Sequence, residues 1–358
     1  MYTIEKSFSA SAYGRYRSKA LDLYFENAKV GILDIETTGL TPDWSHFVLG
    51  GLLSFTENEA TFKQYFVEDL AEERQVLSAY LAEAAKNDIL ITYNGKRFDF
   101  PFLHMRTSRL GLKEPNFPYN FDLYLVLNGF SQLRKFLPNL TQKTIENFMG
   151  LWQFRRDEIS GRESAVLYQK YLVSKRNGTG TEGIIEKMLL HNSDDVLQLG
   201  RLLPVLEKTN LHNAMYCLGF PVAPLIVEKI AIGKNDLKIS GKQSASSFDF
   251  IFYGSDQQDQ RIEFDQRSKS FGISLPILRN SGLVLLDLTK LHVNLCNEVS
   301  IYPNFGDGYL VLQNRNNINY TEINYFIKLY LKKTIEKNFG GIDDVKKNEN
   351  AYEAGRSL

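Results

Sequence analysis

The pattern of apolar and polar positions in the first part of the chain predicts strands before and after one amphipathic helix. Apolar runs rich in Val, Phe and Tyr at 29–36, 47–55 and 60–67 are typical of buried strands. Residues 71–86 then carry apolar side chains at helical spacing, and 88–94 return to a strand. Three strands, a helix and a further strand predict a mixed sheet covered by helices.

The later part of the chain has a helical pattern followed by a pattern of short strands. Ser160 and Glu163 have the spacing of a capping box and predict a helix start, and 181–208 form a long helical stretch that Pro204 should bend or interrupt. From about residue 220, short apolar segments separated by Gly, Ser and Asn predict strands, closed by a helix at 321–339. We therefore expect a mixed α/β domain followed by a smaller β-rich domain.

These changes of pattern divide the chain into four predicted segments. They are an N-terminal extension at 1–27, an α/β domain at 28–210, a β-rich domain at 211–340 and a polar tail at 341–358. A chain of 358 residues is long enough for two domains, each with its own core.

Composition limits the classes of function. The formal net charge is zero, so affinity for nucleic acid would have to come from a local basic patch. The first ten residues lack a basic segment followed by an apolar one, and no apolar run approaches the roughly 18 residues of a membrane span. Cys217 and Cys296 lie far apart in the sequence and fit reduced thiols. We expect a cytoplasmic protein that does not associate with membranes.

Acidic side chains in three separated segments carry the candidate chemistry. Asp34 and Glu36 lie two positions apart on a predicted strand and so face the same way. Asp99 lies at a strand-to-helix junction, while His191 and Asp195 are four positions apart and share a helix face. Adjacent carboxylates repel one another and are costly to desolvate, so such a pair usually needs a cation.

Together these residues suit two-metal phosphoryl chemistry. Hard divalent cations take oxygen ligands, and two of them about 4 Å apart can hold an attacking water and a leaving oxygen. A nearby histidine can accept the proton of the water. Each signal also has an ordinary interpretation: a solvated strand face for the acid pair, a helix cap for Asp99 and a surface or core histidine for His191. Asp194 is an alternative to Asp195, but it lies about a quarter turn from the face of His191.

Three motifs resemble those of the DEDD 3′→5′ exonuclease superfamily, which has an RNase H-like fold: "DIETTGL" at 34–40, "YNGKRFDFPFL" at 93–103 and "HNSDDVLQL" at 191–199. The YprB-type family of RNase H-like bacterial proteins has a similar series, with an intervening stretch like residues 155–172. The second motif also resembles the proofreading domain of family B DNA polymerases. The resemblance covers about 28–205 and implies an α/β fold for that part, an RNase H-like mixed sheet flanked by helices. The smaller C-terminal β-rich domain closed by a helix is predicted from the apolar pattern alone.

The resemblance also implies roles for the site residues. Asp34, Glu36, Asp99 and Asp195 would bind two Mg²⁺ or Mn²⁺ ions, with Asp34 bridging both. His191 would accept the proton, although it stands at the spacing where the familiar motif has Tyr; the YprB-type pattern shares this exchange. Related nucleases hold the terminal nucleotide with residues that follow the first motif or flank the second, for which turn chemistry and packing are the alternative: Thr37, Thr38, Leu40, Asn94 and Phe98.

The distribution of charge fits an anionic polymer. Residues 94–176 carry 14 Lys and Arg against 7 Asp and Glu, whereas 34–88 carry 3 against 11. This basic segment, which includes Arg155 and Arg156, predicts a phosphate-guiding surface, with an ordinary solvated face as the alternative.

The sequence therefore predicts a metal-dependent 3′→5′ exonuclease that acts on single-stranded or frayed nucleic-acid ends and releases nucleoside monophosphates. An RNase H-like endonuclease and a non-catalytic nucleic-acid-binding module are the alternatives. The retention of all four acids argues against a decayed site. The β-rich domain could recruit a protein partner, extend the substrate groove or mediate dimerisation.

Overall fold

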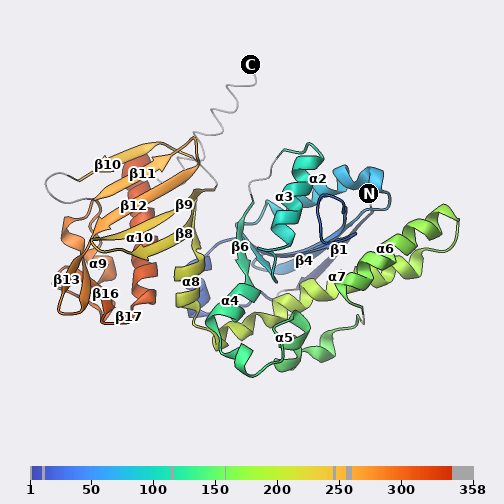
Figure 1. The fold of residues 1–358 in the computed structure, drawn as a ribbon, viewed down its shortest axis with the longest axis horizontal. Coiled ribbons are helices and arrows are strands. Elements are labelled where there is room, and N and C mark those ends of the chain that lie inside the picture. The colour runs from blue at the N-terminus through green and yellow to red at the C-terminus, as the bar shows by residue number, and fades with distance from the viewer. Residues whose placement is uncertain are drawn as a thin grey trace, which may run out of the picture. The chain divides into compact units, whose positions relative to one another are not determined.

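The computed structural model describes residues 2–9, 13–113, 117–157, 159–244, 247–254 and 260–340, so the predicted tail at 341–358 lies outside the described residues. The described chain forms two compact units (Figure 1). The first ends at Asn210 and the second begins at Leu211, except that residues 20–24 belong to the second unit.

The first unit is built on a six-stranded mixed sheet with the strand order β1-β4-β3-β2-β5-β6. Neighbouring strands from β1 to β2 run antiparallel, and β2, β5 and β6 run parallel. The strands are β1 (Tyr2–Ser9), β2 (Val30–Thr37), β3 (Phe47–Phe55), β4 (Glu59–Phe66), β5 (Ile89–Thr92) and β6 (Tyr119–Asp122). The four strands predicted in this region correspond to β2 to β5, whereas β1 and β6 were not predicted.

Helices cover both faces of this sheet (Figure 1). One apolar cluster packs α2 and α3 against β2, β3, β4 and β5, and a second packs α6 and α7 against β3 and β4. The predicted capping box at Ser160 and Glu163 is present at the start of α6. The helices are α2 (Glu73–Ala84), α3 (Asp99–Arg109), α4 (Leu123–Phe130), α5 (Gln142–Phe148), α6 (Gly161–Arg176) and α7 (Glu182–Leu202).

Two glycines on β3 let helices approach the sheet beside the first acidic motif. Gly51 pairs with Asp34 in the sheet, and a Cβ atom on Gly51 would collide with the side-chain amide of Asn192 on α7. A Cβ atom on the adjacent Gly50 would lie 2.6 Å from the ring of Tyr80 on α2. Helix α7, which carries the third motif, can therefore pack closely over β2.

This helix ends at Leu202, followed by a short 3₁₀ helix (Leu203–Lys208) that begins where Pro204 was expected to interrupt it.

A buried ion pair fixes α3, the helix that begins with Asp99. Arg106 Nε on α3 lies 2.8 Å from Glu73 Oε1 on α2. Glu73 also accepts hydrogen bonds from the backbone N–H of Phe47 at 2.8 Å and from His46 Nδ1 at 2.7 Å. The side chains of Arg106 and Glu73 are 8% and 2% exposed. Removing either one would leave the other as an unpaired buried charge, which destabilises the folded protein.

Replacing Arg106 with Met should therefore destabilise the protein by about 3–5 kcal/mol, because Glu73 would remain buried without its cation. Urea denaturation at pH 7 measures this loss. On the same helix, Arg109→Met is the matched control: its side chain is 47% exposed and pairs with exposed Asp43, so it should cost less than about 1 kcal/mol. Equal losses for the two arginines would show that the buried pair does not stabilise the fold.

The second unit contains two antiparallel sheets and several helices. The larger sheet has the order β10-β11-β12-β9-β8-β7, and the smaller has the order β13-β14-β16-β15 with β17 paired to β16. The strands are β7 (Phe220–Val222), β8 (Leu225–Ile232), β9 (Asp236–Gln243), β10 (Phe250–Tyr253), β11 (Arg261–Asp265), β12 (Ser270–Pro276), β13 (Leu278–Asn280), β14 (Leu283–Asp287), β15 (Phe305–Gly306), β16 (Tyr309–Asn314) and β17 (Asn317–Ile318). The helices are α1 (Lys19–Phe25), α8 (Leu211–Leu218), α9 (Cys296–Val299) and α10 (Tyr320–Phe339).

The architecture confirms the predicted fold class: a mixed sheet flanked by helices, and a β-rich region closed by a helix. The closing helix α10 buries one apolar face, formed by Ile323, Phe326, Ile327, Tyr330, Leu331 and Ile335. None of the helices in the described part of the chain combines the length and the apolarity needed to cross a membrane.

Candidate active site

The first acidic motif lies on β2 and faces α7. Asp34 is half-buried and Glu36 is 5% exposed, while Ile35 between them points into the apolar core beneath α2 and α3. The alternation of faces along a strand therefore separates the two acids from the core residue, as the sequence predicted.

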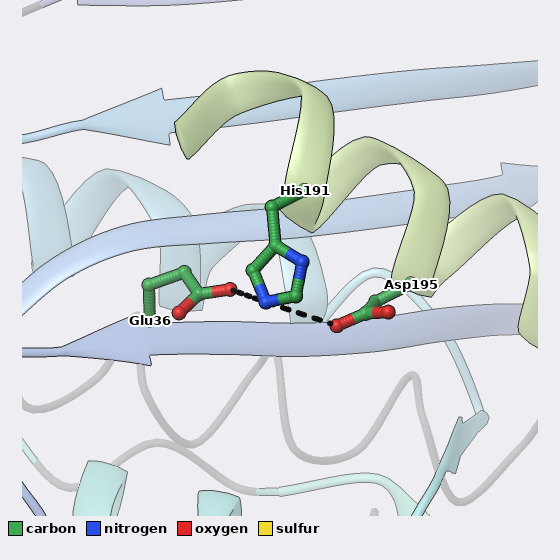
Figure 2. A group of neighbouring side chains, drawn as sticks. All are labelled: Glu36, His191 and Asp195. Atoms are coloured by element: carbon green, nitrogen blue, oxygen red, sulfur yellow. Dashed lines mark ion pairs between the residues drawn. The ribbon is translucent and has the colours of Figure 1, made fainter. Parts of the chain in front are cut away.

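The third motif brings His191 and Asp195 over the same part of β2. Figure 2 shows the imidazole of His191 lying between the carboxylates of Glu36 and Asp195. His191 Nε2 lies 3.5 Å from Glu36 Oε1 and 3.5 Å from Asp195 Oδ2. One potential ligand atom from each of these residues lies within 4.8 Å of the other two, so the three side chains form a group that could hold a metal ion.

The other two predicted acids are Asp34, on the same strand β2, and Asp99. Asn192 Nδ2 on α7 donates a hydrogen bond of 2.9 Å to Asp34 Oδ2, and Asn192 Oδ1 accepts one of 3.0 Å from Gln64 Nε2. Asp99, the first residue of α3, is 5% exposed; burial raises its pKa, and the backbone of Ile35 on β2 is near enough to lower it. The structure thus brings together the four acids and the histidine that the sequence singled out. Asn192 was not singled out, although it lies inside the third motif.

A second charged group beside these acids was not predicted as part of the site. Asp157 Oδ2 lies 2.7 Å from His191 Nδ1, and Asp157 Oδ1 lies 2.5 Å from Arg155 Nη1. Arg155 Nη2 lies 2.6 Å from Asp195 Oδ1 and 2.8 Å from Glu146 Oε1. The side chain of Arg155 is only 8% exposed, so this guanidinium is a counter-ion shared by three carboxylates. The resemblance of residues 155–172 to a family stretch was the signal that could have drawn attention to Asp157.

These contacts correct the prediction that Arg155 helps to form a phosphate-guiding surface, because its guanidinium is already bonded inside the protein. Arg156 has an exposed side chain, and its role in phosphate binding stays a prediction. Asp194, the alternative to Asp195, accepts hydrogen bonds from the backbone N–H groups of Arg156 and Asp157 at 2.5 and 2.8 Å. It therefore holds the segment that carries Asp157.

The acids raise one another's pKa values. Burial, followed by the charges of Asp195, Glu36 and Asp99, raises the pKa of Asp34 well above its ordinary value. Burial and the charges of Asp195 and Asp99 do the same to the pKa of Glu36. Burial also raises the pKa of Asp99 to about 7. Four mutually repelling, oxygen-donating groups are the chemistry that a hard divalent cation would neutralise, so these residues fit such an ion.

His191 and Asp157 form a hydrogen-bonded pair in which each group favours the charged form of the other, in contrast to the repelling acids. Burial alone would lower the pKa of His191, but its hydrogen bond to Asp157 and the charges of Asp195, Asp157 and Asp34 give a net rise. Burial alone would raise the pKa of Asp157, but hydrogen bonds from His191 and Arg155 bring it below its ordinary value. Asp157 is therefore ionised at neutral pH.

Comparison with known proteins assigns this domain to a family. The family model of the RNase H superfamily matches residues 32–206, a range that contains all four acids and His191. The chain is also 28% identical over 169 residues to the uncharacterized protein YprB of Bacillus subtilis (strain 168), a match that covers 46% of this chain and 39% of YprB. Residues 32–206 form a YprB-type RNase H-like domain. The predicted YprB-type RNase H-like family is confirmed.

Two DNA polymerases are also similar to part of this chain. A DNA polymerase of Pyrococcus glycovorans is 33% identical over 101 residues, which cover 25% of this chain and 13% of the polymerase. The family B DNA polymerase from Pyrobaculum calidifontis superposes with a TM-score of 0.39 and 18% identity, over 53% of this chain and 26% of the polymerase. The chain spans well under half the length of both curated relatives.

The residues predicted to hold a terminal nucleotide have mixed surroundings. Thr37 Oγ1 donates to the carbonyl of Gly39 at 2.7 Å, and Thr38 Oγ1 accepts from the backbone N–H of His46 at 2.9 Å. Asn94 adopts a left-handed φ of 66° and Phe98 packs against the core beneath α3, whereas Leu40 is 82% exposed. Turn and packing contacts thus account for four of these five residues, and substrate binding by all five stays a prediction.

The raised pKa values have a consequence for stability. When folding raises the pKa of a carboxyl group, that group stabilises the folded protein at pH values below its pKa in the unfolded chain, about 4. This stabilisation is lost as the pH rises through the pKa in the folded protein, which is about 7 for Asp99. We therefore expect the Tm of the metal-free protein to fall between about pH 5 and pH 8. Added Mg²⁺ should raise the Tm more at pH 8 than at pH 5, which scanning calorimetry measures.

The double variant Asp34→Asn, Glu36→Gln is the control for this expectation. Without metal at pH 8 it should be more stable than the wild type, because two repelling charges are gone, and Mg²⁺ should raise its Tm little. An Mg²⁺ effect as large as that of the wild type would mean that the ion binds elsewhere.

Proposed function

We propose that the RNase H-like domain is a metal-dependent 3′→5′ exonuclease of the DEDD type that acts on single-stranded or frayed nucleic-acid ends and releases nucleoside monophosphates. The observation that carries this proposal is the convergence of Asp34, Glu36, Asp99 and Asp195 with His191, from β2, α3 and α7. The 33% identity to a DNA polymerase over 101 residues supports nucleic acid as the substrate class.

The four carboxylates would hold two Mg²⁺ or Mn²⁺ ions, in agreement with their oxygen donors, their burial and their raised pKa values. Such ions supply charge neutralisation at the scissile phosphate and orient the reacting oxygens. The contribution of the chain is to fix the carboxylates. Asn192 holds Asp34, and Arg155 holds one oxygen of Asp195.

His191 would act as the proton acceptor for the attacking water. Its Nε2 faces Glu36 and Asp195, and the ring is nearly buried at 2% exposure, so bulk water competes little for that nitrogen. For this role the ring must be neutral, and Nε2 must carry the lone pair.

Leu40 and Arg156 are the predicted substrate contacts with exposed side chains. In this proposal Leu40 packs against the terminal base and Arg156 contacts the backbone phosphate. Thr37, Thr38, Asn94 and Phe98 shape the turns around them.

Oligonucleotides of DNA and RNA, labelled at the 5′ end and carrying either a free or a blocked 3′ end, test the proposal. With Mg²⁺ or Mn²⁺, free ends should be shortened stepwise with release of nucleoside monophosphates, and EDTA should abolish the reaction. Blocked ends should persist. Internal cleavage of blocked substrates would favour the endonuclease alternative, and metal-dependent binding without cleavage would favour the binding module.

A further inference from the structure

The two ring nitrogens of His191 have different surroundings. Nδ1 lies 2.7 Å from Asp157 Oδ2, a normal hydrogen-bond distance, whereas Nε2 lies 3.5 Å from both Glu36 and Asp195, beyond that distance. Figure 2 shows Nε2 turned toward these two carboxylates. An ionised carboxylate can only accept hydrogen bonds, so the contact with Asp157 requires a proton on Nδ1. In the neutral ring, the lone pair then lies on Nε2.

Asp157 is held firmly enough to impose this orientation. Its side chain is 1% exposed, its Oδ1 is bonded to Arg155 and its Oδ2 lies 3.2 Å from Lys143 Nζ. Its backbone N–H donates to Asp194, which lies on the same helix as His191. The carboxylate is therefore anchored at both oxygens and through the backbone. The carboxylate of Asp157 thus sets the orientation of the His191 imidazole.

We infer that Asp157 is a positioning residue that fixes the Nδ1–H tautomer of His191 and aims Nε2 at the site formed by Glu36 and Asp195. The catalytic consequence rests on the proposed nuclease function, whereas the tautomer itself does not. Arg155 connects the positioning residue to the acid site, because it binds Asp157 through Nη1 and Asp195 through Nη2.

The variant Asp157→Asn should reverse the tautomer. Arg155 bonds to Oδ1 at 2.5 Å, so the oxygen of the new amide should stay at that position and its NH₂ group should face His191. Lys143 is 43% exposed and also donates to the carbonyl of Ile159 at 2.6 Å, a bond that it can keep without the carboxylate of Asp157. An NH₂ group donates to an unprotonated Nδ1, which moves the proton to Nε2 and removes the acceptor from the site.

Nuclear magnetic resonance of the ¹⁵N-labelled, metal-free protein tests the tautomer without any activity. The ¹⁵N chemical shifts of the neutral ring identify which nitrogen carries the proton, and His191→Gln assigns the signal among the five histidines. We expect Nδ1–H in the wild type and Nε2–H in Asp157→Asn. The matched control is Glu146→Gln, which changes a carboxyl group that is also 1% exposed and bonded to Arg155, whereas no hydrogen bond or ion pair among the residues that the structure describes joins it to His191. This control should keep Nδ1–H.

Kinetics give a second readout. In Asp157→Asn, kcat should fall by about 10²- to 10⁴-fold while KM changes little, the range expected when a positioned base has the wrong tautomer. The kinetic control is Glu59→Gln, a change at an exposed carboxyl group on β4, and it should keep kcat within about twofold of the wild type.

The two tests separate the inference from the proposed function. An Nε2–H tautomer in the wild type, or an unchanged Nδ1–H tautomer in folded Asp157→Asn, would overturn the positioning role whatever the activity. An inactive wild type with the expected change of tautomer would contradict the nuclease proposal and leave the positioning intact. A loss of kcat in Glu59→Gln as large as that in Asp157→Asn would also overturn the inference, because the loss would then not depend on the contact with His191.

Discussion

The double variant Asp34→Asn, Glu36→Gln should lower metal-dependent hydrolysis of 3′ ends by at least about 10³- to 10⁴-fold. Both acids lie on one face of β2, where Glu36 forms a group with His191 and Asp195. Burial and the charges of Asp195 and Glu36 raise the pKa of Asp34. Bound divalent cations are worth several kcal/mol of transition-state stabilisation, and each 1.4 kcal/mol or so corresponds to a factor of ten in rate. The amides keep the size of the side chains but remove their charge. Single-turnover rates on an end-labelled oligonucleotide measure the effect.

Two exposed acids provide the matched control: Glu57 in the turn between β3 and β4, and Glu59 at the start of β4. Changing both to Gln removes the same charge from the protein and should leave the rate within about twofold, because exposed surface changes have small effects. Appreciable hydrolysis by the double variant of Asp34 and Glu36 would exclude this acid pair as the centre of the reaction.

Replacing His191 with Ala should reduce turnover by about 10²- to 10⁴-fold, the usual contribution of a positioned general base. Mg²⁺ should still stabilise this variant against heat, because the four carboxylates remain. The exposed His104 on α3 is the matched control, and His104→Ala should retain normal turnover. Steady-state rates measure the turnover of both variants, and thermal melts with and without Mg²⁺ measure how much the ion stabilises each of them.

Two outcomes would contradict this assignment of His191. Near-normal turnover in His191→Ala would mean that hydrolysis proceeds without a protein base. Loss of the Mg²⁺ effect on Tm would instead make His191 a metal ligand, a role that its position within 4.8 Å of Glu36 and Asp195 ligand atoms permits.

Local periodicity explains why much of the site could be predicted from the sequence. The period of two along β2 separates Asp34 and Glu36 from Ile35, and helical spacing aligns His191 with Asp195. The position of Asp99 against β2 does not follow from periodicity, and the motif resemblance supplied it. Strand β1 was missed because most of its residues are exposed and carry no apolar alternation.

The Arg155 contacts could not be predicted, for a different physical reason. A count of charges along the chain treats each arginine as a solvated cation and carries no information about its partners. Arg155 binds Asp195, 40 positions away, and Asp157 binds His191, 34 positions away, from a segment without regular secondary structure. Such contacts depend on how α5, α6 and α7 pack together, which no local pattern specifies.

The most direct test of the account is the position of a bound ion. A crystal of the wild-type protein grown with Mn²⁺ can be measured at a wavelength where manganese scatters anomalously. We expect anomalous density at coordinating distance from the carboxylate oxygens of Asp34 and Glu36, adjacent to Asp195, and none there in the double variant Asp34→Asn, Glu36→Gln. Manganese bound only at other places, or a wild-type site that stays without density at saturating Mn²⁺, would contradict the claim that these acids form a metal-dependent active site.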